Sequence, residues 1–314
     1  MKMLGSNYSD SLFGTDGVDT IYGLDGNDLI SAWDSGNGNA DKLYGGEGND
    51  LISGLSFNMD FLSKSASFRA VVDGGADNDT AIISLHSAAQ TTMIAKIRPA
   101  FTMQNVEDVI YHFDGLSNKQ RVVGSDRSET IYLGENNANG LGMDGNDYLF
   151  SGTGDDVLNG GSGNDLLSAA GGHNTLTGGS GADLFHFHLT QDYQYSEITD
   201  FKSGTDKIAL FIDIDDKELK PERTYGDELR ELGQQVDTLG YIDYDHGRYF
   251  DKSTFKASVD DYYLYNMIYE RSTGSFLQRV YIDKGDGLRE YDVLLAHIDG
   301  NPDLKPTDFV FHVM

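Results

Sequence analysis

Polar and apolar positions in one part of the chain repeat with a period of nine residues. Every ninth position is an aspartate or asparagine, and the side chain two positions later is apolar. The polar members of the series are Asp147, Asp156, Asp165, Asn174 and Asp183, and the apolar members are Leu149, Leu158, Leu167, Leu176 and Phe185. A repeat this short buries its apolar side chain only by stacking on its neighbours. The pattern therefore predicts a solenoid of short strands.

The same period is present near the beginning of the chain, where it is less regular. Its polar positions are Asp10, Asp19 and Asp28, followed after a longer step by Asp41 and Asp50. Asp79 closes a further glycine-rich turn, which follows a stretch without repeats at 54–70. We expect the stacking to lose its phase at the longer step, and we interpret the turn at Asp79 as isolated.

Glycine-rich turns connect the predicted strands, as in Gly160-Gly-Ser-Gly-Asn-Asp165. Glycine adopts φ > 0 without steric cost, so such a turn can expose its carbonyl oxygens. The aspartate adds a charged oxygen at the same point of every turn. Carboxylate and carbonyl oxygens, with no cysteine and no regularly spaced histidine, favour calcium over zinc or copper.

The pattern Gly-Gly-x-Gly-x-Asp-x-apolar-x resembles the nonapeptide repeat of the RTX family of calcium-binding proteins. The resemblance implies an all-β fold, a parallel β-roll in which two nonapeptides form one coil of 18 residues. Calcium ions would lie between turns that stack every second repeat. In this arrangement Asp165 stacks between Asp147 and Asp183, whereas Asp156 stacks on the neutral Asn174, which implies a weaker site.

The resemblance implies several Ca²⁺ ions, and it assigns their ligands to side chains and glycine turns. The predicted side-chain ligands are Asp10, Asp19, Asp28, Asp41, Asp50, Asp79, Asp147, Asp156, Asp165, Asn174 and Asp183. The predicted glycine positions are Gly142, Gly145, Gly160, Gly161, Gly163, Gly178, Gly179 and Gly181. The sequence does not determine how many ions bind.

Four regions follow from this interpretation. They are a first β-roll block with irregular insertions (1–82), a strand-containing connector (83–123), a second β-roll block (124–190) and a β-rich C-terminal capping and secretion region (191–314). The connector either continues the solenoid with irregular coils or has a binding role. In the last region, residues 198–208, 293–302 and 307–311 resemble family segments that add strands over the open end of the roll. Residues 215–235 are the best candidate for a helix.

Composition points to a ligand that carries positive charge. The chain has 51 acidic and 23 basic residues, a net charge of −28, and no cysteine. Divalent cations would neutralise this charge and stabilise the fold. The same charge argues against nucleic acid or an anionic membrane as a partner. No apolar run is long enough to span a bilayer, and no signal peptide is visible at the start. The resemblance then implies type I secretion from a Gram-negative bacterium, with the secretion apparatus as a partner during export.

Motifs for catalysis are not found. The sequence contains no His-Glu-x-x-His, no Gly-x-Ser-x-Gly and no P-loop. We therefore predict a non-enzymatic, secreted calcium-binding protein that folds on Ca²⁺ outside the cell and acts there by binding or assembly, with a partner that the sequence does not name. One alternative is a cation-conducting pore or host-interaction protein, because the chain resembles the small RTX nodulation protein O. The other is an accessory to an RTX hydrolase or epimerase, or an enzyme whose site lies within 210–314.

Overall fold

The computed structural model describes residues 1–33, 40–58, 70–87, 92–93, 101–106, 108–115, 120–188, 194–212, 237–243, 248–251, 264–283 and 288–313. The chain divides into two compact units, Met1–Gly152 and Thr153–Met314. The described residues form β-strands almost throughout, together with one 3₁₀ turn, η2 (Pro306–Asp308). The predicted all-β fold built on parallel sheets is therefore confirmed. The helix predicted at 215–235 lies outside the described residues.

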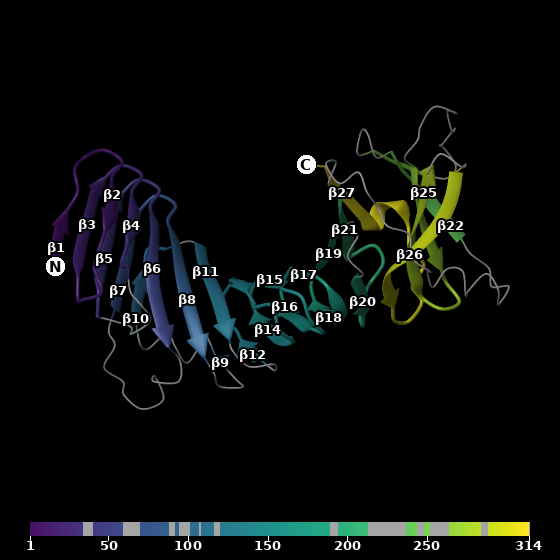
Figure 1. Ribbon diagram of the computed structural model, residues 1–314, viewed down its shortest axis with the longest axis horizontal. Coiled ribbons are helices and arrows are strands. Elements are labelled where there is room, and N and C mark those ends of the chain that lie inside the picture. Colours follow the sequence, from purple (N-terminus) through teal and green to yellow (C-terminus); the bar gives the residue numbers. More distant parts are fainter. Residues whose placement is uncertain are drawn as a thin grey trace. The chain divides into compact units, whose positions relative to one another are not determined.

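Unit 1 is built from parallel strands (Figure 1). One sheet has the order β1 (Lys2–Leu4), β3 (Thr20–Asp25), β5 (Lys42–Glu47), β7 (Ala70–Ala76), β10 (Phe101–Gln104). A second has the order β2 (Ser11–Phe13), β4 (Leu29–Ser31), β6 (Leu51–Asn58), β8 (Thr80–Ser87), β11 (Asp108–Gly115), β13 (Thr130–Tyr132), β15 (Tyr148–Ser151). The strands β9 (Thr92–Met93), β12 (Gln120–Val123) and β14 (Ala138–Asp144) also pair in parallel. From β1 to β8, successive strands alternate between the first two sheets, as in the coils of a roll.

The coils of unit 1 differ in length but keep one stacking register. Leu29 pairs with Ser11 on one side and with Leu51 on the other, and Leu51 pairs with Thr80. The extra residues of the longer coils include 34–39 and 59–69, which lie outside the described residues. The expectation that the turn at Asp79 is isolated was therefore wrong. An insertion between two strands lengthens a coil without moving the strands that flank it.

Residues of the predicted connector pair with strands of the roll. Strand β10 lies beside β7, and β11 lies between β8 and β13, all in parallel. The segment thus continues the solenoid, which is the simpler of its two interpretations.

Unit 2 combines parallel roll strands with an antiparallel sheet (Figure 1). One parallel series is β17 (Leu166–Ala169), β19 (Leu184–His188), β21 (Lys207–Ile212), β27 (Phe309–Val313). The other is β16 (Val157–Ser162), β18 (Gly172–Ser180), β20 (Gln194–Ile198), β26 (Leu288–Ile298). From β26 the sheet continues antiparallel through β25 (Ser275–Asp283), β24 (Leu264–Glu270), β22 (Asp237–Asp243) and β23 (Arg248–Asp251). Strands β26 and β27 thus cover the last roll strands, β20 and β21.

The apolar side chains of the repeats form the core of each unit. In unit 1, Ile21, Ile30, Leu43, Ile52 and Leu149 have no exposed surface. In unit 2 the same holds for Leu158, Leu167, Leu176, Phe185 and Ile208. Each occupies the position two residues after a polar repeat residue, so the stacked strands remove this one position from water in coil after coil.

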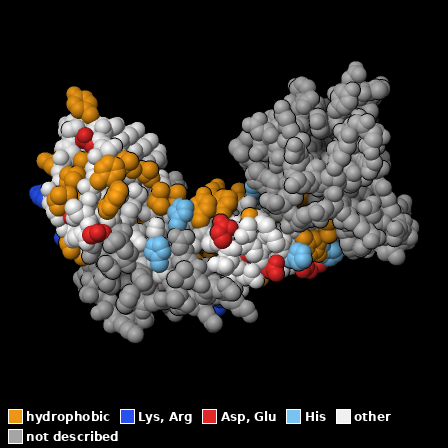
Figure 2. All heavy atoms as spheres, in the orientation of Figure 1, with side chains coloured by type: hydrophobic (Ala, Val, Ile, Leu, Met, Phe, Trp, Pro, Cys, Tyr) orange, Lys and Arg blue, Asp and Glu red, His pale blue; other side chains and the backbone are white. Residues whose placement is uncertain are grey.

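Aromatic side chains also stack on the outer surfaces of two sheets of unit 1. On β11, β13 and β15, Tyr132 lies between His112 and Phe150, with ring centroids 4.7 and 4.8 Å apart. On β3 and β5 of the other sheet, Tyr22 stacks on Tyr44 at 4.8 Å. These pairs join neighbouring coils, because equivalent positions in parallel strands lie side by side. Hydrophobic side chains gather on the one face of unit 1 that Figure 2 shows.

Candidate metal centre

The polar repeat residues form rows that run across the stacked turns. In each row a main-chain amide donates a hydrogen bond to Oδ1 of the residue in the next turn. In unit 1 the pairs are Asp10–Asp28, Asp28–Asp50 and Asp50–Asp79 at 2.8 Å, Asp19–Asp41 at 2.7 Å and Glu129–Asp147 at 2.9 Å. In unit 2 they are Asp156–Asn174 at 3.0 Å, Asp165–Asp183 at 3.1 Å and Asp183–Asp206 at 3.2 Å. One carboxylate oxygen of each acceptor is thus used by the fold itself.

The turns take a left-handed backbone at two positions, four and two residues before the aspartate. In the turn that ends at Asp50 these positions are Gly46 and Gly48, with φ of 131° and 111°. A side chain on Gly46 would overlap the backbone of Leu24 in the previous turn. At Gly46, therefore, only glycine fits both the φ angle and the close approach of the previous turn. Leu24 and Met143 have positive φ at the equivalent position of other turns. Among the predicted glycines, Gly145, Gly161, Gly163, Gly179 and Gly181 also have positive φ.

The remaining predicted glycines lie where the turns touch each other or a carboxylate. A side chain on Gly160 or Gly178 would overlap Oδ2 of the aspartate that closes its own turn, Asp165 or Asp183. The carbonyl oxygen of Gly142 lies against Gly124 of the neighbouring turn. Each carboxylate therefore lies over its own glycine turn.

The second oxygen of several carboxylates is buried without a protein partner. Oδ2 of Asp28, Asp50 and Asp183 accepts no hydrogen bond among the described residues, although the three residues are at most 3% exposed. A buried anionic oxygen without a partner is costly, because it has lost its hydration and gained nothing in exchange. A cation at this oxygen would remove the cost, and a hard ion such as Ca²⁺ suits a donor set made only of oxygen. These residues therefore fit a calcium ion.

The electrostatics of these carboxyl groups agree with the need for a cation. Burial raises the pKa of Asp50 to about 6, and the neighbouring Asp79 and Asp28 carboxylates act in the same direction. The hydrogen bond with the Asp28 backbone opposes them. Burial likewise raises the pKa of Asp28 and of Asp183. Without a metal ion, the fold thus disfavours the charged form of these groups.

Other predicted ligands occupy equivalent places in the rows. Asp41, Asp79, Asp147, Asp156 and Asp165 are at most 2% exposed, and each belongs to a row through its carboxylate or its amide. All five also have buried Oδ2 atoms, beside a glycine turn or at the same repeat position. The structure thus places them in the same arrangement as Asp28, Asp50 and Asp183.

The first turns of unit 1 satisfy their carboxylates with a hydroxyl group. Oδ2 of Asp10 accepts hydrogen bonds from the amide and hydroxyl of Ser6, at 2.6 and 2.9 Å. Oδ2 of Asp19 accepts the same pair from Thr15, at 2.6 and 3.0 Å. Asp10 and Asp19 therefore differ from Asp28, Asp50 and Asp183, because protein donors already hold the oxygen that would face an ion.

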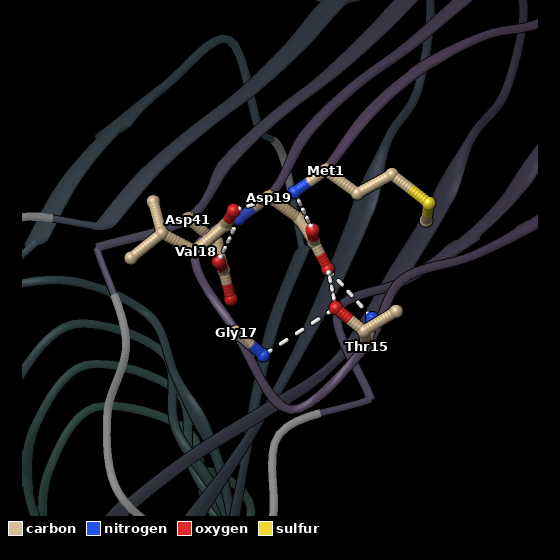
Figure 3. A network of polar contacts seen from close by, with 6 residues as sticks. All are labelled: Met1, Thr15, Gly17, Val18, Asp19 and Asp41. Carbon is tan, nitrogen blue, oxygen red and sulfur yellow. Dashed lines mark hydrogen bonds and ion pairs between the residues drawn. The ribbon is translucent and has the colours of Figure 1, made fainter.

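Asp19 also contacts the amino group of Met1, and its amide donates to Asp41 (Figure 3). Burial alone would raise the pKa of Asp19, but the hydrogen bonds from Met1 and Thr15 outweigh it and hold the pKa below its ordinary value. Glu129 has the same arrangement, since Ser125 donates to it through both its amide and its hydroxyl. Where a serine or threonine lies four residues before the acidic residue, the carboxylate of the turn thus has hydrogen-bond donors without a metal ion.

Asn174 uses its amide nitrogen where a cation would otherwise bind. Its Nδ2 donates to the carbonyl oxygens of Ala170 and Gly171, at 3.2 and 3.4 Å, while its Oδ1 accepts from Asp156. The side-chain amide therefore takes the carbonyl oxygens of its own turn. This arrangement gives a physical reason for a weaker calcium site in this row.

Sequence reasoning missed the residue that ends the row in unit 2, Asp206. Its Oδ1 accepts from the amide of Asp183 and its Oδ2 accepts from the amide of Lys202 at 2.7 Å. The ammonium of Lys202 also donates to the carbonyl oxygen of Gly179 at 2.6 Å. A lysine thus supplies positive charge at this end of the row. The signal was present in the sequence, since Gly204 precedes Asp206 by two positions and the buried Ile208 follows it by two.

Comparison with protein families decides what these rows are. The family of the RTX calcium-binding nonapeptide repeat matches four times, at residues 4–34, 35–58, 141–176 and 159–189. The chain thus carries RTX calcium-binding repeats. The matched segments contain Asp28, Asp50 and Asp183, whose buried Oδ2 atoms accept no hydrogen bond from the described residues. No curated protein matches the RTX chain significantly. Within the described part of the RTX chain, no helix has the length and apolar character needed to cross a membrane.

Proposed function

We propose that this RTX protein is secreted, folds on calcium outside the cell and then acts there by binding or assembly. The observation that carries the proposal is the buried Oδ2 of Asp28, Asp50 and Asp183, which accepts no hydrogen bond from any described residue. At neutral pH such oxygens are a cost of folding, and calcium turns that cost into a favourable interaction. The stability of the repeats then depends on the calcium concentration.

With this calcium dependence, the repeats would have different folding states inside and outside the cell. Extracellular calcium modules have dissociation constants of about 10⁻⁴–10⁻³ M. With sites of that strength, the repeats stay unfolded in a cytosol poor in calcium and fold on reaching the medium. An unfolded chain is also what a narrow export channel requires, which supports a type I secretion apparatus as the partner during export. Residues 293–302 and 307–311, on and near β26 and β27, are the proposed secretion segments.

Binding rather than catalysis is the proposed activity. The carboxylates that dominate the described repeats hold backbone amides of neighbouring turns, so their placement serves the fold and the proposed ions.

A calcium titration followed by far-UV circular dichroism tests the folding step. Calcium at millimolar concentration should produce the β signal cooperatively from the EDTA-treated protein. Magnesium should not replace it, because Mg²⁺ requires a small octahedral site and releases its water reluctantly. A spectrum that is the same in EDTA and in calcium would contradict calcium-dependent folding.

Export is tested separately with truncated chains in cells that carry a type I transporter. Removal of 255–314 should keep the protein inside the cells, whereas removal of 1–30 should leave export intact. A chain that lacks 255–314 and still reaches the medium at the full rate would contradict the proposed route while leaving calcium-dependent folding untouched.

A further inference from the structure

Three side chains of unit 2 that can bind metal converge at the joint between β20 and β26. Glu197 of β20 and His297 of β26 are direct partners in the parallel pairing, so their side chains lie on the same face of the sheet. Asp299 follows His297 by two residues and is held by the hydrogen bond from its amide to the carbonyl oxygen of Ile198, at 2.8 Å. The neighbours Ala296 and Ile298 are fully buried on the opposite face.

The three potential ligand atoms lie within 4.8 Å of one another. Nδ1 of His297 and Oδ1 of Asp299 are 3.5 Å apart. All three residues are half-buried. We propose that Glu197, His297 and Asp299 bind a divalent transition-metal ion, with zinc as the representative case. This site is separate from the calcium rows and does not depend on the proposed function.

The donor set distinguishes this site from the repeats. Calcium sites consist of oxygen atoms, whereas an imidazole nitrogen with two carboxylates suits zinc and related ions. Zinc binds nitrogen and carboxylate oxygen at about 2.0–2.2 Å, so small rotations of these three side chains bring their donors onto one ion. Partial exposure leaves a further coordination position open to water.

The charges at the site favour a cation. Two carboxylates lie close together, and no lysine or arginine of the described residues is paired with either of them. Gly274, on the turn before β25, lies beside the ring, since a Cβ there would come 3.3 Å from Nε2 of His297. Its missing side chain leaves space around the imidazole. A divalent ion would neutralise the two carboxylates where the described residues provide no paired lysine or arginine.

The location gives the ion a structural role. Strand β26 joins the antiparallel sheet to the roll strand β20, and the parallel register covers only Ser196–Ile198 against Ala296–Ile298. A metal ion bound to Glu197 on one strand and to His297 and Asp299 on the other would tie this short joint together. The site would then hold the C-terminal sheet on the last coil of unit 2.

Isothermal titration with zinc chloride, on the full chain saturated with calcium, tests the proposal. The wild type should bind zinc, and cobalt in its place should give visible absorption bands from nitrogen and oxygen ligands. His297→Ala should weaken zinc binding by about 100-fold or more, since loss of a second-shell group alone costs about 10–100-fold. Glu197→Gln retains the side-chain shape and should weaken binding about tenfold or more.

His173→Ala provides the matched control, because His173 is an exposed histidine of the same unit, on β18, that contacts Tyr195 rather than the cluster. It should bind zinc like the wild type. Hydrogen exchange at the amides of β26 should slow with zinc in the wild type and not in His297→Ala. Circular dichroism in calcium shows whether each variant is folded. If His297→Ala does not fold, the zinc affinity of Glu197→Gln is the test of the site. Equal zinc affinity in the wild type and in a folded site variant would overturn the proposal.

Discussion

The amide of Asp28 donates a 2.8 Å hydrogen bond to Oδ1 of Asp50, although the two residues are 22 positions apart. The amide of Asp10 makes the same bond, also at 2.8 Å, to Asp28, which is only 18 positions away. The next step, from Asp50 to Asp79, spans 29 positions with the same distance. The geometry of the turn therefore determines the row, and the length of the coil between turns does not.

We predict that Asp50→Ala weakens calcium binding by about tenfold or more, whereas Asp10→Ala has a much smaller effect. Oδ2 of Asp50 has no hydrogen-bond partner among the described residues, so an ion would stabilise it, but Oδ2 of Asp10 is held by Ser6. A tenfold change corresponds to about 1.4 kcal/mol, a reasonable loss for one charged ligand. Calcium titrations of the two variants measure this difference. Equal losses of calcium affinity would contradict the distinction between a carboxylate held by serine and one whose Oδ2 is left for an ion.

Asn174→Asp should strengthen calcium binding to the row that includes Asp156. The substitution adds a charge and removes the amide nitrogen that donates to Ala170 and Gly171, which frees two carbonyl oxygens for an ion. At low calcium concentration the same change should lower the free energy of unfolding, because the new carboxylate is buried without those bonds. Thermal unfolding at saturating calcium, and at the lowest calcium concentration at which the wild type is still folded, measures both effects. A variant that loses stability in both conditions would contradict the prediction.

Thr15→Val should lower the free energy of unfolding by about 2 kcal/mol, the typical contribution of a hydrogen bond to a charged group. The hydroxyl of Thr15 donates to Oδ2 of Asp19 in a turn that is satisfied without metal. The loss should therefore be the same whether the calcium concentration is just saturating or tenfold higher. Denaturant unfolding at the two concentrations is the measurement. Full rescue by additional calcium would show instead that an ion replaces the hydroxyl.

The calcium-free fold should become less stable as the pH rises from about 4 to about 6. In this range the carboxyl of Asp50 loses its proton in the unfolded chain, near the ordinary value of 3.8, before it does so in the folded protein, near 6. The unfolded state then binds fewer protons, so the free energy of unfolding falls with rising pH. The raised pKa values of Asp28 and Asp183 act in the same direction.

Protons and calcium compete for the same oxygens, so calcium affinity should fall as the pH drops through about 6. The β signal in far-UV circular dichroism without calcium, compared at pH 4 and pH 7, checks the first effect, because the fold should be retained better at the lower pH. Calcium titrations at pH 5 and pH 7 check the second effect. Asp50→Asn should reduce the pH dependence of the calcium-free stability and that of the calcium affinity. If the variant kept the full pH dependence, Asp50 would be ruled out as a contributor.

Much of the fold was predictable because the repeat is local. An apolar residue placed two positions after each aspartate can only point to one side of a short strand, and Leu158, Leu167 and Leu176 are indeed fully buried. Glycines four and two positions before the aspartate require a left-handed turn, as found at Gly161 and Gly163. These features depend on neighbours within one nonapeptide, so the spacing along the chain is sufficient to predict them.

The row partners of Asp79 and Asp206 were beyond the reach of spacing alone, although the local pattern around each residue is that of a repeat. Asp79 joins its row across a coil of 29 residues, and Asp206 joins Asp183 across 23. Their positions depend on which strands pair, and pairing is determined by contacts between residues far apart in the chain. When the length of a coil differs from the period of the repeat, the period does not predict which strands pair.

The amino-acid sequence by itself determined the RTX repeat, the inward side chains and the preference for calcium, since each follows from residue types at fixed local spacing. Only the tertiary structure decided which carboxylates need an ion. Asp10 and Asp50 occupy the same repeat position, yet Ser6 satisfies one and no protein group satisfies Oδ2 of the other. The difference arises because the demand for a cation depends on burial and on nearby donors in space, which the order of residues does not display.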